Sequence, residues 1–254
     1  MKNNLSGDIA DIDQLNAIIA GSGNIVFFGG AGVSTESGIP DFRSGSGLYK
    51  DPRYATPPEK ILSHSYFIAN TGEFYSFYRE NILHLDAKPN AAHYKLAELE
   101  RAGKLRAVIT QNIDGLHQKA GSKNVVELHG SVHRNYCVDC KKSYNARYIA
   151  KSKGVPVCEC GGVIKPDVVL YEENLKQNDI TRAIAYISEA DAFIIGGTSL
   201  VVYPAAGLAG YYKGNKLVII NKSETDRDAG ALLVIRKGIG EVMSEVTVDE
   251  IQIK

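Results

Sequence analysis

The sequence predicts an α/β protein built on an open parallel sheet with helices on both faces. Short apolar runs rich in β-branched residues recur along the chain, and stretches with helical periodicity separate them. The length of 254 residues is enough for one large domain that carries a smaller insertion. A hydrophobic content of 44% and a charged content of 23% are ordinary for a globular protein and argue against disordered and fibrous classes.

Each predicted strand is an apolar run, and most are preceded by a predicted helix. The first strand, residues 25–28, reads Ile-Val-Phe-Phe and follows a helix predicted over residues 9–20. A helix over 90–102 leads to the second strand, and a third strand follows soon after. Helices over 181–189 and 204–212 precede the fourth and fifth strands, and a last helix is expected after Gly240. The five later strands are predicted at residues 105–110, 125–128, 192–195, 217–220 and 232–235.

Two stretches interrupt this pattern and are predicted to form a smaller domain inserted into the larger one. Residues 48–86 are rich in Tyr, Phe and His at helical spacing. Residues 133–165 contain all four cysteines of the chain. Neither stretch has the composition of a linker.

The four cysteines form two close pairs, Cys137 with Cys140 and Cys158 with Cys160. Two such pairs in a reducing compartment predict four thiolates around a tetrahedral Zn²⁺, with neighbouring glycines that let the chain turn toward sulfur. A pair of disulfides is the weaker alternative, because thiols stay reduced in the cytosol. The second pair is Cys-x-Cys, which is tighter than the commoner Cys-x-x-Cys, but both sulfurs can still reach one metal.

The most informative stretch is the turn after the first strand, residues 29–43. A buried strand that ends in glycines and continues into Ser, Thr and Glu presents backbone N–H groups to a phosphate. The dinucleotide fingerprint Gly-x-Gly-x-x-Gly is not met, because Thr35 stands where the third glycine would be. On spacing alone, a nucleotide site and an ordinary glycine-rich turn are equally good interpretations. The stretch ends in Asp41-Phe42-Arg43, which is more specific than a phosphate loop requires and points to chemistry at the same site.

Polar residues also follow other predicted strands, at what would be one edge of the sheet. Residues 110–117 include amides and a carboxylate, which can hold ribose hydroxyls or a carboxamide. His129 follows the third strand and can either move a proton near neutral pH or serve the structure. Residues 196–199 repeat the strand, glycine and hydroxyl arrangement, which binds a phosphate or caps a helix. Asn221 follows the fifth strand and could bond to a ribose or an adenine.

Charge and hydropathy argue against two classes of protein. The 29 basic and 29 acidic side chains balance, so the sequence has no electrostatic footprint for general nucleic-acid binding. No apolar run approaches the roughly 18 to 20 residues that a membrane span requires. The polar start, Met1-Lys2-Asn3-Asn4, does not read as a signal peptide, and a cytoplasmic protein is expected.

Taken together, these motifs resemble the sirtuin family in content and in order, from about Ile9 to Val242. The motifs that carry the resemblance are Gly30-Ala31-Gly32-Val33-Ser34, Ser37-Gly38-Ile39-Pro40-Asp41-Phe42-Arg43, Thr110-Gln111-Asn112-Ile113-Asp114, His129-Gly130, the paired cysteines and Gly197-Thr198-Ser199.

The resemblance implies an NAD-dependent protein deacetylase that acts on acetylated lysine of proteins or peptides. The products would be nicotinamide, O-acetyl-ADP-ribose and the deacetylated lysine. The resemblance also implies an NAD-binding, Rossmann-like domain of residues 1–47, 87–132 and 166–254. The small domain would then consist of a helical part, residues 48–86, and a zinc module, residues 133–165.

The resemblance also implies roles for individual residues. His129 would be the general base, Asn112 the second catalytic residue, and Phe42 a shield for the reactive face of the cofactor after nicotinamide leaves. The residues implied to bind NAD are Gly30, Ala31, Gly32, Thr35, Asp41, Phe42, Arg43, Gln111, Asn112, Ile113, Asp114, His129, Gly197, Thr198, Ser199, Asn221 and Ile239. The residues implied to hold Zn²⁺, too far from the cleft to act as a Lewis acid, are Cys137, Cys140, Cys158 and Cys160. The residues implied to contact the substrate peptide are Val168, Val169, Leu170 and Val202.

One departure from a pattern of the family bears on the acyl group. Sirtuins that prefer succinyl- or malonyl-lysine resemble one another in a Tyr-x-x-Arg pair, in which Arg meets the substrate carboxylate. Here Tyr75 is followed at that spacing by Tyr78, and Arg79 points about one residue further round the helix. Neutral acyl groups, with acetyl first, are therefore expected.

Two other classes of function remain as alternatives. A zinc-containing NAD dehydrogenase would need an open metal site and a complete glycine fingerprint, whereas four cysteines close the predicted zinc site. The second alternative is an ADP-ribose-binding or zinc-ribbon interaction module, in which His129 and Asp114 would have no catalytic role. Mono-ADP-ribosylation is a side activity that the same site could support.

Overall fold

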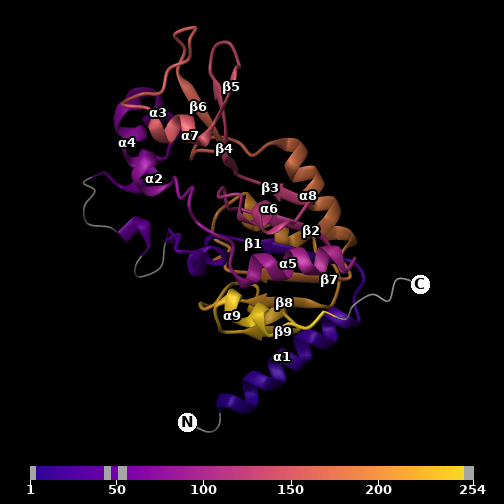
Figure 1. Ribbon diagram of the computed structural model, residues 1–254. Coiled ribbons are helices and arrows are strands. Elements are labelled where there is room, and N and C mark those ends of the chain that lie inside the picture. The colour runs from indigo at the N-terminus through magenta and orange to yellow at the C-terminus, as the bar shows by residue number, and fades with distance from the viewer. Residues whose placement is uncertain (1–3, 43–46, 51–55, 249–254) are drawn as a thin grey trace.

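The structure is a computed structural model that describes residues 4–42, 47–50 and 56–248. Its centre is a six-stranded sheet in the order β3-β2-β1-β7-β8-β9, with every neighbouring pair parallel (Figure 1). The prediction of an α/β fold with a parallel sheet is confirmed. The strands of this sheet are β1 (Ile25–Gly29), β2 (Leu105–Thr110), β3 (Val125–Glu127), β7 (Ala192–Gly196), β8 (Leu217–Ile220) and β9 (Leu233–Ile235).

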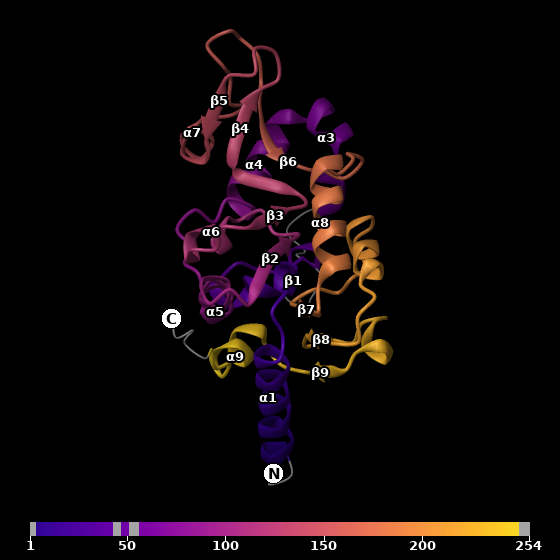
Figure 2. The same ribbon diagram turned by 90° about the vertical axis from the view of Figure 1, so that its right-hand side faces the viewer.

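Both faces of the sheet are buried, because alternate side chains of each strand point to opposite faces. In β1, Ile25 and Phe27 pack on one face, and Val26 and Phe28 pack on the other. The first face is covered by α1 (Asn4–Ala20), α5 (Ala91–Arg101) and α9 (Ile239–Ser244), and the second by α8 (Gln177–Glu189) and η4 (Ala205–Tyr211). Figure 2 shows α5 and α9 on one side of the sheet and α8 on the other.

Several of the predicted helices differ in the structure. Helices α1 and α8 begin earlier than predicted, at Asn4 and Gln177. In place of the α-helix predicted over residues 204–212, the structure has the 3₁₀ helix η4 (Ala205–Tyr211), and the glycines at positions 207 and 210 weaken α-helix formation there. Helix α9 begins at Ile239, before Gly240, because the Glu36 carboxylate accepts a hydrogen bond from the Gly240 N–H at 2.8 Å. Among the helices in the described ranges, none combines the length and apolarity needed to cross a bilayer.

A second sheet, with strand order β5-β4-β6, is antiparallel and lies apart from the first (Figure 1). Its strands are β4 (Gly130–Cys137), β5 (Ser143–Asn145) and β6 (Ile164–Val168), with α7 (Ala146–Lys151) after β5. The helices beside it are α2 (Pro58–Ile61), α3 (His64–Ala69) and α4 (Thr71–Asn81). Phe74 and Tyr75 of α4 share one apolar core with Cys137 and Ile164 of the sheet. The helices and the cysteine-bearing sheet therefore stabilise each other.

This second sheet extends beyond residues 133–165 at both ends, to Gly130 and Val168. Gly130 has a φ of 76°, and a Cβ there would lie 1.9 Å from the Asp167 carbonyl oxygen. A glycine is required at this position for β4 to approach β6 directly after His129.

The remaining short elements lie in the segments that join the strands and longer helices. They are η1 (Ala31–Val33), η2 (Thr35–Ser37), η3 (Leu48–Lys50), α6 (Leu116–Ala120) and η5 (Asp228–Gly230). Asn90, just before α5, accepts a hydrogen bond from the Ala92 N–H at 3.0 Å and donates one to the Val33 carbonyl at 2.8 Å. The start of α5 is thus tied to the turn that follows β1.

Candidate active site

A cavity of about 890 Å³ lies where β1, β2, β7 and β8 end. Its lining includes the residues directly after these strands, and its opposite wall comes from residues 168–173 and from α4. The strand order of the sheet reverses between β1 and β7, and open α/β sheets bind ligands at this switch point. The convergence expected for the polar strand ends is therefore present.

The glycine turns after β1 and β7 touch each other. The Gly32 N–H donates to the Gly197 carbonyl at 2.8 Å, and a Cβ on Gly32 would lie 2.8 Å from the Gly197 Cα. A Cβ on Gly30 would lie 2.7 Å from the Thr198 Cβ. The two turns, far apart in the sequence, form one cradle that larger residues would fill, which leaves their backbones open to close approach by a ligand.

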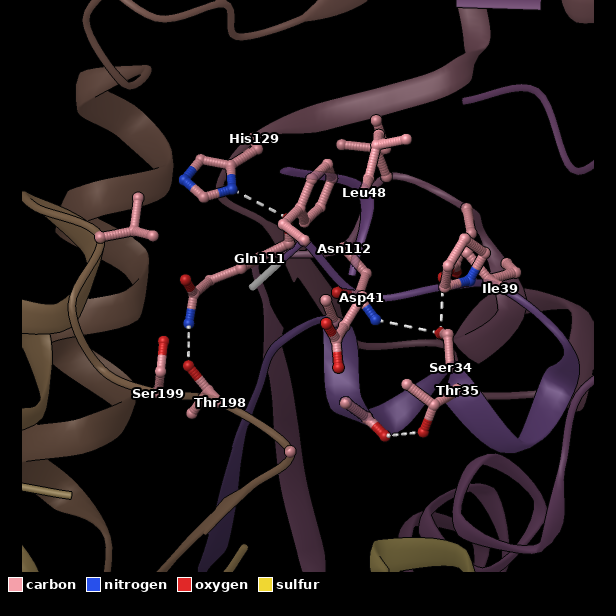
Figure 3. Close-up of a pocket in the computed structure, with 18 of the residues that line it drawn as sticks. Ser34, Thr35, Ile39, Asp41, Leu48, Gln111, Asn112, His129, Thr198 and Ser199 are labelled. Atoms are coloured by element: carbon pink, nitrogen blue, oxygen red, sulfur yellow. Dashed lines mark hydrogen bonds between the residues drawn. The ribbon is translucent and has the colours of Figure 1, made fainter. Parts of the chain in front are cut away.

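Ser34 connects the turn after β1 to the turn after β2. Its Oγ donates to Asp114 Oδ2 at 2.6 Å. It also accepts from Asn112 Nδ2 at 3.0 Å (Figure 3). Asp114 Oδ1 accepts a hydrogen bond from the Leu116 N–H at 2.8 Å. The amide of Asn112 and the carboxylate of Asp114 are thereby fixed at the cavity wall.

Gln111 links the turn after β2 to the turn after β7. Its Nε2 donates to Thr198 Oγ1 at 3.0 Å, and its backbone N–H donates to the Gly29 carbonyl at 2.9 Å (Figure 3). The Thr198 hydroxyl oxygen also accepts from the Leu200 N–H at 3.2 Å. The Thr198 hydroxyl oxygen therefore accepts two hydrogen bonds from the protein.

His129 lies in the same wall, held in one orientation and one tautomer. Its Nδ1 is 2.8 Å from the Gln111 carbonyl oxygen, and because a carbonyl can only accept, Nδ1 carries the proton in the neutral ring. Burial lowers the pKa of His129 below its ordinary value, and the bond to Gln111 opposes this only in part. His129 is therefore neutral near pH 7, with Nε2 able to accept a proton.

The opposite wall begins next to His129. The Val169 N–H donates to the His129 carbonyl at 2.9 Å, which joins the general-base candidate to the segment expected to contact the peptide. Glu173 accepts hydrogen bonds from the Leu170 N–H at 3.0 Å, from His64 at 2.8 Å and from Lys165 at 3.1 Å. Burial by itself would raise the pKa of Glu173. The contacts with Leu170, His64 and Lys165 outweigh this effect, so the pKa lies below its ordinary value and the carboxylate stays charged. Residues 200–202, on the other side, form no strand.

The four cysteines converge at the tip of the second sheet, and their sulfur atoms all lie within 4.8 Å of one another. Cys137 and Cys160 are 3.5 Å apart at sulfur, as are Cys140 and Cys158. A disulfide would require about 2.05 Å. Four thiolates about 2.3 Å from one Zn²⁺ lie roughly 3.8 Å apart, so these residues fit a closed tetrahedral zinc site. Close approach is possible because a Cβ on Gly162 would lie 2.7 Å from Cys137 Sγ.

The cavity includes nearly all the residues predicted to bind NAD or peptide. Gly30 does not line it but supports Thr198 from behind, and Arg43 lies outside the described residues. The predicted residues that do line it are Ala31, Gly32, Thr35, Asp41, Phe42, Gln111, Asn112, Ile113, Asp114, His129, Val168, Val169, Leu170, Gly197, Thr198, Ser199, Val202, Asn221 and Ile239.

Several cavity residues were not predicted as site residues. Ser34 lies inside the glycine-rich motif, and its hydroxyl group could have identified it as a site residue. Lys222 follows Asn221 just after β8. It could have been predicted by the same argument as Asn221, that polar residues after the strands lie at one edge of the sheet. Tyr49 and Tyr171 also line the cavity, but no sequence pattern connects residues so far apart.

Comparison with known proteins agrees with this geometry. A model of the Sir2 family matches residues 30–204. An NAD-dependent protein deacetylase of Clostridium acetobutylicum is 60% identical over 238 residues, which cover 92% of this chain and 97% of the relative. An NAD-dependent protein deacetylase of Cutibacterium acnes is 52% identical over 92% of this chain and 96% of the relative.

Solved structures show the same fold. A Sir2 structure with a deacetylated p53 peptide and 3′-O-acetyl ADP ribose has a TM-score of 0.85 and 42% identity, covering 92% of this chain and 96% of that one. A Sir2 structure with a p53 peptide and NAD⁺ has a TM-score of 0.81 and 43% identity, covering 91% of this chain and 95% of that one. From its motifs, its fold and these similarities, the chain belongs to the Sir2 family.

Proposed function

We propose that this protein is an NAD-dependent protein-lysine deacetylase that releases nicotinamide, O-acetyl-ADP-ribose and the deacetylated lysine. The observation that carries the proposal is the position of His129. A partly buried, neutral imidazole with a bonded Nδ1 and an available Nε2 lies between the glycine cradle and the segment of Val169. The names of the relatives and the bound molecules of the Sir2 structures support the same reaction.

The residues present fit NAD as the co-substrate. The cradle of Gly32 and Gly197 would accept the phosphates, with Ser199 and Asn221 at the ribose and adenosine part. Asn112 and Asp114, both fixed through Ser34, would hold the nicotinamide and its ribose. When bound, NAD supplies a reactive anomeric carbon that takes up the acetyl oxygen of the substrate lysine as nicotinamide leaves.

In this reaction His129 would accept a proton at Nε2 from a ribose hydroxyl, so that the hydroxyl oxygen can attack the acetyl carbon. The Gln111 carbonyl would stabilise the resulting imidazolium by holding the Nδ1 proton. The peptide would lie between residues 168–170 and the segment of Val202, pairing through backbone groups as an added strand. The division into an NAD-binding domain, residues 1–47, 87–132 and 166–254, and a small domain, residues 48–86 and 133–165, is part of this proposal.

Zn²⁺ would be held by the four cysteines and would stabilise the small domain without taking part in catalysis. All four positions of the metal would be filled by sulfur, so no position is open for substrate or water. A cytoplasmic location is also proposed, because thiols that serve as zinc ligands persist in a reducing compartment.

The proposed function is tested by incubating the protein with NAD and an acetylated peptide and following all products by mass spectrometry. We expect nicotinamide release that requires the acetylated peptide, together with equal amounts of deacetylated peptide and O-acetyl-ADP-ribose. Formation of NADH would instead indicate a dehydrogenase. NAD or ADP-ribose binding without any turnover would indicate a binding module.

The same assay with a succinylated peptide of identical sequence tests the acyl preference, and we expect the acetylated peptide to react faster. Arg79 does not supply a cation to the cavity. Its Nη1 donates to Ser152 Oγ at 3.3 Å, and its guanidinium lies 5.7 Å from the centre of the Tyr75 ring. Tyr78, which does line the cavity, is uncharged and fully buried. Faster reaction of the succinylated peptide would contradict this preference.

The pH dependence of kcat/KM is expected to show an acid limb with a midpoint below pH 6.5. The ordinary pKa of histidine is about 6.5, and burial lowers that of His129. A base must be unprotonated to act, so activity is present above the lowered pKa and is lost as pH falls through it. An acid limb centred above pH 6.5 would contradict the assignment of this pKa to His129.

A further inference from the structure

Two tyrosines from opposite walls of the cavity meet through their hydroxyl groups. Tyr49 lies in η3 and Tyr171 lies just after β6, and their hydroxyl oxygens are 2.5 Å apart. Both residues line the cavity. Nothing in the reaction described above requires this contact.

On one side, Tyr171 is anchored in the backbone of the small domain. Its N–H donates to the Leu62 carbonyl at 3.0 Å, and its own carbonyl accepts from the His64 N–H at 3.0 Å. The preceding residue, Leu170, is held through its N–H by the Glu173 carboxylate. Tyr171 is therefore a fixed point next to the wall proposed to contact the peptide.

On the other side, Tyr49 holds Phe42. The two ring centroids are 5.3 Å apart at an interplanar angle of 48°, and the Tyr49 N–H donates to the Phe42 carbonyl at 2.9 Å. The neighbouring Leu48 N–H donates to the Asp41 carbonyl at 2.9 Å. Phe42 lines the cavity beside these residues, so the position of its ring depends on the position of Tyr49.

We propose that the hydrogen bond between Tyr49 and Tyr171 positions Phe42 over the cofactor part of the cavity, by tying the Phe42 segment to the peptide wall. Tyr49 and Tyr171 are positioning residues, because they act through Phe42 rather than on the reacting atoms. The inference rests on the proposed deacetylase function. A fixed Phe42 ring keeps water from the anomeric carbon of NAD until the acetyl oxygen attacks.

Loss of this hydrogen bond should therefore favour a side reaction. Water would add to the anomeric carbon as its bond to the nicotinamide nitrogen breaks, giving ADP-ribose, nicotinamide and one proton. NAD would then be consumed without deacetylation. The ratio of NAD consumed to lysine deacetylated reports this directly and does not depend on how much protein is folded.

The test uses Tyr49→Phe, Tyr171→Phe and the double variant, each of which removes a hydroxyl and keeps the ring. We expect the consumption ratio to rise from one to about two or more, because the closed site no longer excludes water. The KM for NAD should rise by about fivefold, the value of one lost hydrogen bond. The effect of the double variant should be smaller than the product of the two single effects, because the shared bond is already lost in each single variant.

Tyr94→Phe is the matched control, since Tyr94 is an exposed tyrosine of α5 that does not line the cavity. It should keep both the ratio and the KM of the unchanged protein. Effects that multiply in the double variant, or unchanged ratios in all variants, would overturn the inference.

Titration of NAD against each variant separates this inference from the proposed function. If the unchanged protein fails to deacetylate any acetylated peptide, the proposed function falls. The role of the contact between the Tyr49 and Tyr171 hydroxyls is then tested only by the affinity of the variants for NAD. Weaker NAD binding in both single variants, with effects that do not multiply in the double variant, supports it, and unchanged binding overturns it.

Discussion

Replacing His129 by alanine is expected to lower kcat for deacetylation by about a thousandfold, which lies within the range for loss of a general base. The affinity for NAD should stay within about threefold, a difference below 1 kcal/mol. These two values are measured by steady-state kinetics with an acetylated peptide and by calorimetric titration with NAD.

The geometry around His129 explains why binding and turnover should separate. The His129 side chain donates a hydrogen bond to the Gln111 carbonyl, while Asn112, Asp114 and Thr198 are fixed through contacts that do not involve His129. Removing the ring therefore leaves the cradle and the amide wall in place. What disappears is the proton acceptor at Nε2.

His129→Asn is the matched control for orientation. An asparagine amide can still donate to the Gln111 carbonyl but has no group that accepts a proton near neutral pH. It should lose as much turnover as His129→Ala, and its residual rate should show no acid limb. Near-normal turnover in either variant would refute the role of His129 as general base.

The sheet could be predicted from the sequence because its strands are buried on both faces and read as continuous apolar runs. The run at residues 25–28 is a clear case, and β1 occupies it with one further residue, Gly29. Helix ends were less predictable, because they depend on distant partners. The start of α9 depends on Glu36, which lies more than 200 positions earlier in the chain.

The cavity residues were largely predictable because parallel strands end at one edge, so polar strand ends must converge. What the sequence cannot reveal is which ends touch. The contact between Gly32 and Gly197, the link from Gln111 to Thr198, and the pairing of Tyr49 with Tyr171 all join residues more than 80 positions apart. The first two contacts follow from strand order, which local sequence does not encode, and the third joins η3 to the segment after β6.

Removing the zinc ligands is expected to have the second large effect, on stability. Cys140 and Cys160 have exposed side chains, and substitutions at exposed positions without special contacts change stability by only about 0.5 kcal/mol. Cys140→Ser or Cys160→Ser should therefore be almost silent if no metal is bound. Structural Zn²⁺ in small modules contributes roughly 10 kcal/mol or more of apparent binding free energy, so a zinc-bound protein should respond strongly.

We expect one zinc per chain in the unchanged protein by atomic emission, and loss of zinc in either variant. A loss of even about 4 kcal/mol would lower Tm by roughly 8 to 16 °C in a domain of this size. Ser143→Ala, at an exposed position of the same sheet, should retain both zinc and Tm. A zinc-free unchanged protein, or a Tm that does not move in the serine variants, would contradict the zinc site.

Loss of zinc in the serine variants should also weaken the reaction, although no cysteine lines the cavity. Cys137 and Cys158 pack in the same core as Tyr75, Ile164 and Val168, and Val168 lines the cavity. If the cysteines lose their metal, this core should loosen, and the wall at Val168 should be displaced more than the parallel sheet. Peptide KM should rise in the serine variants while NAD affinity is retained, because the glycine cradle belongs to the other sheet.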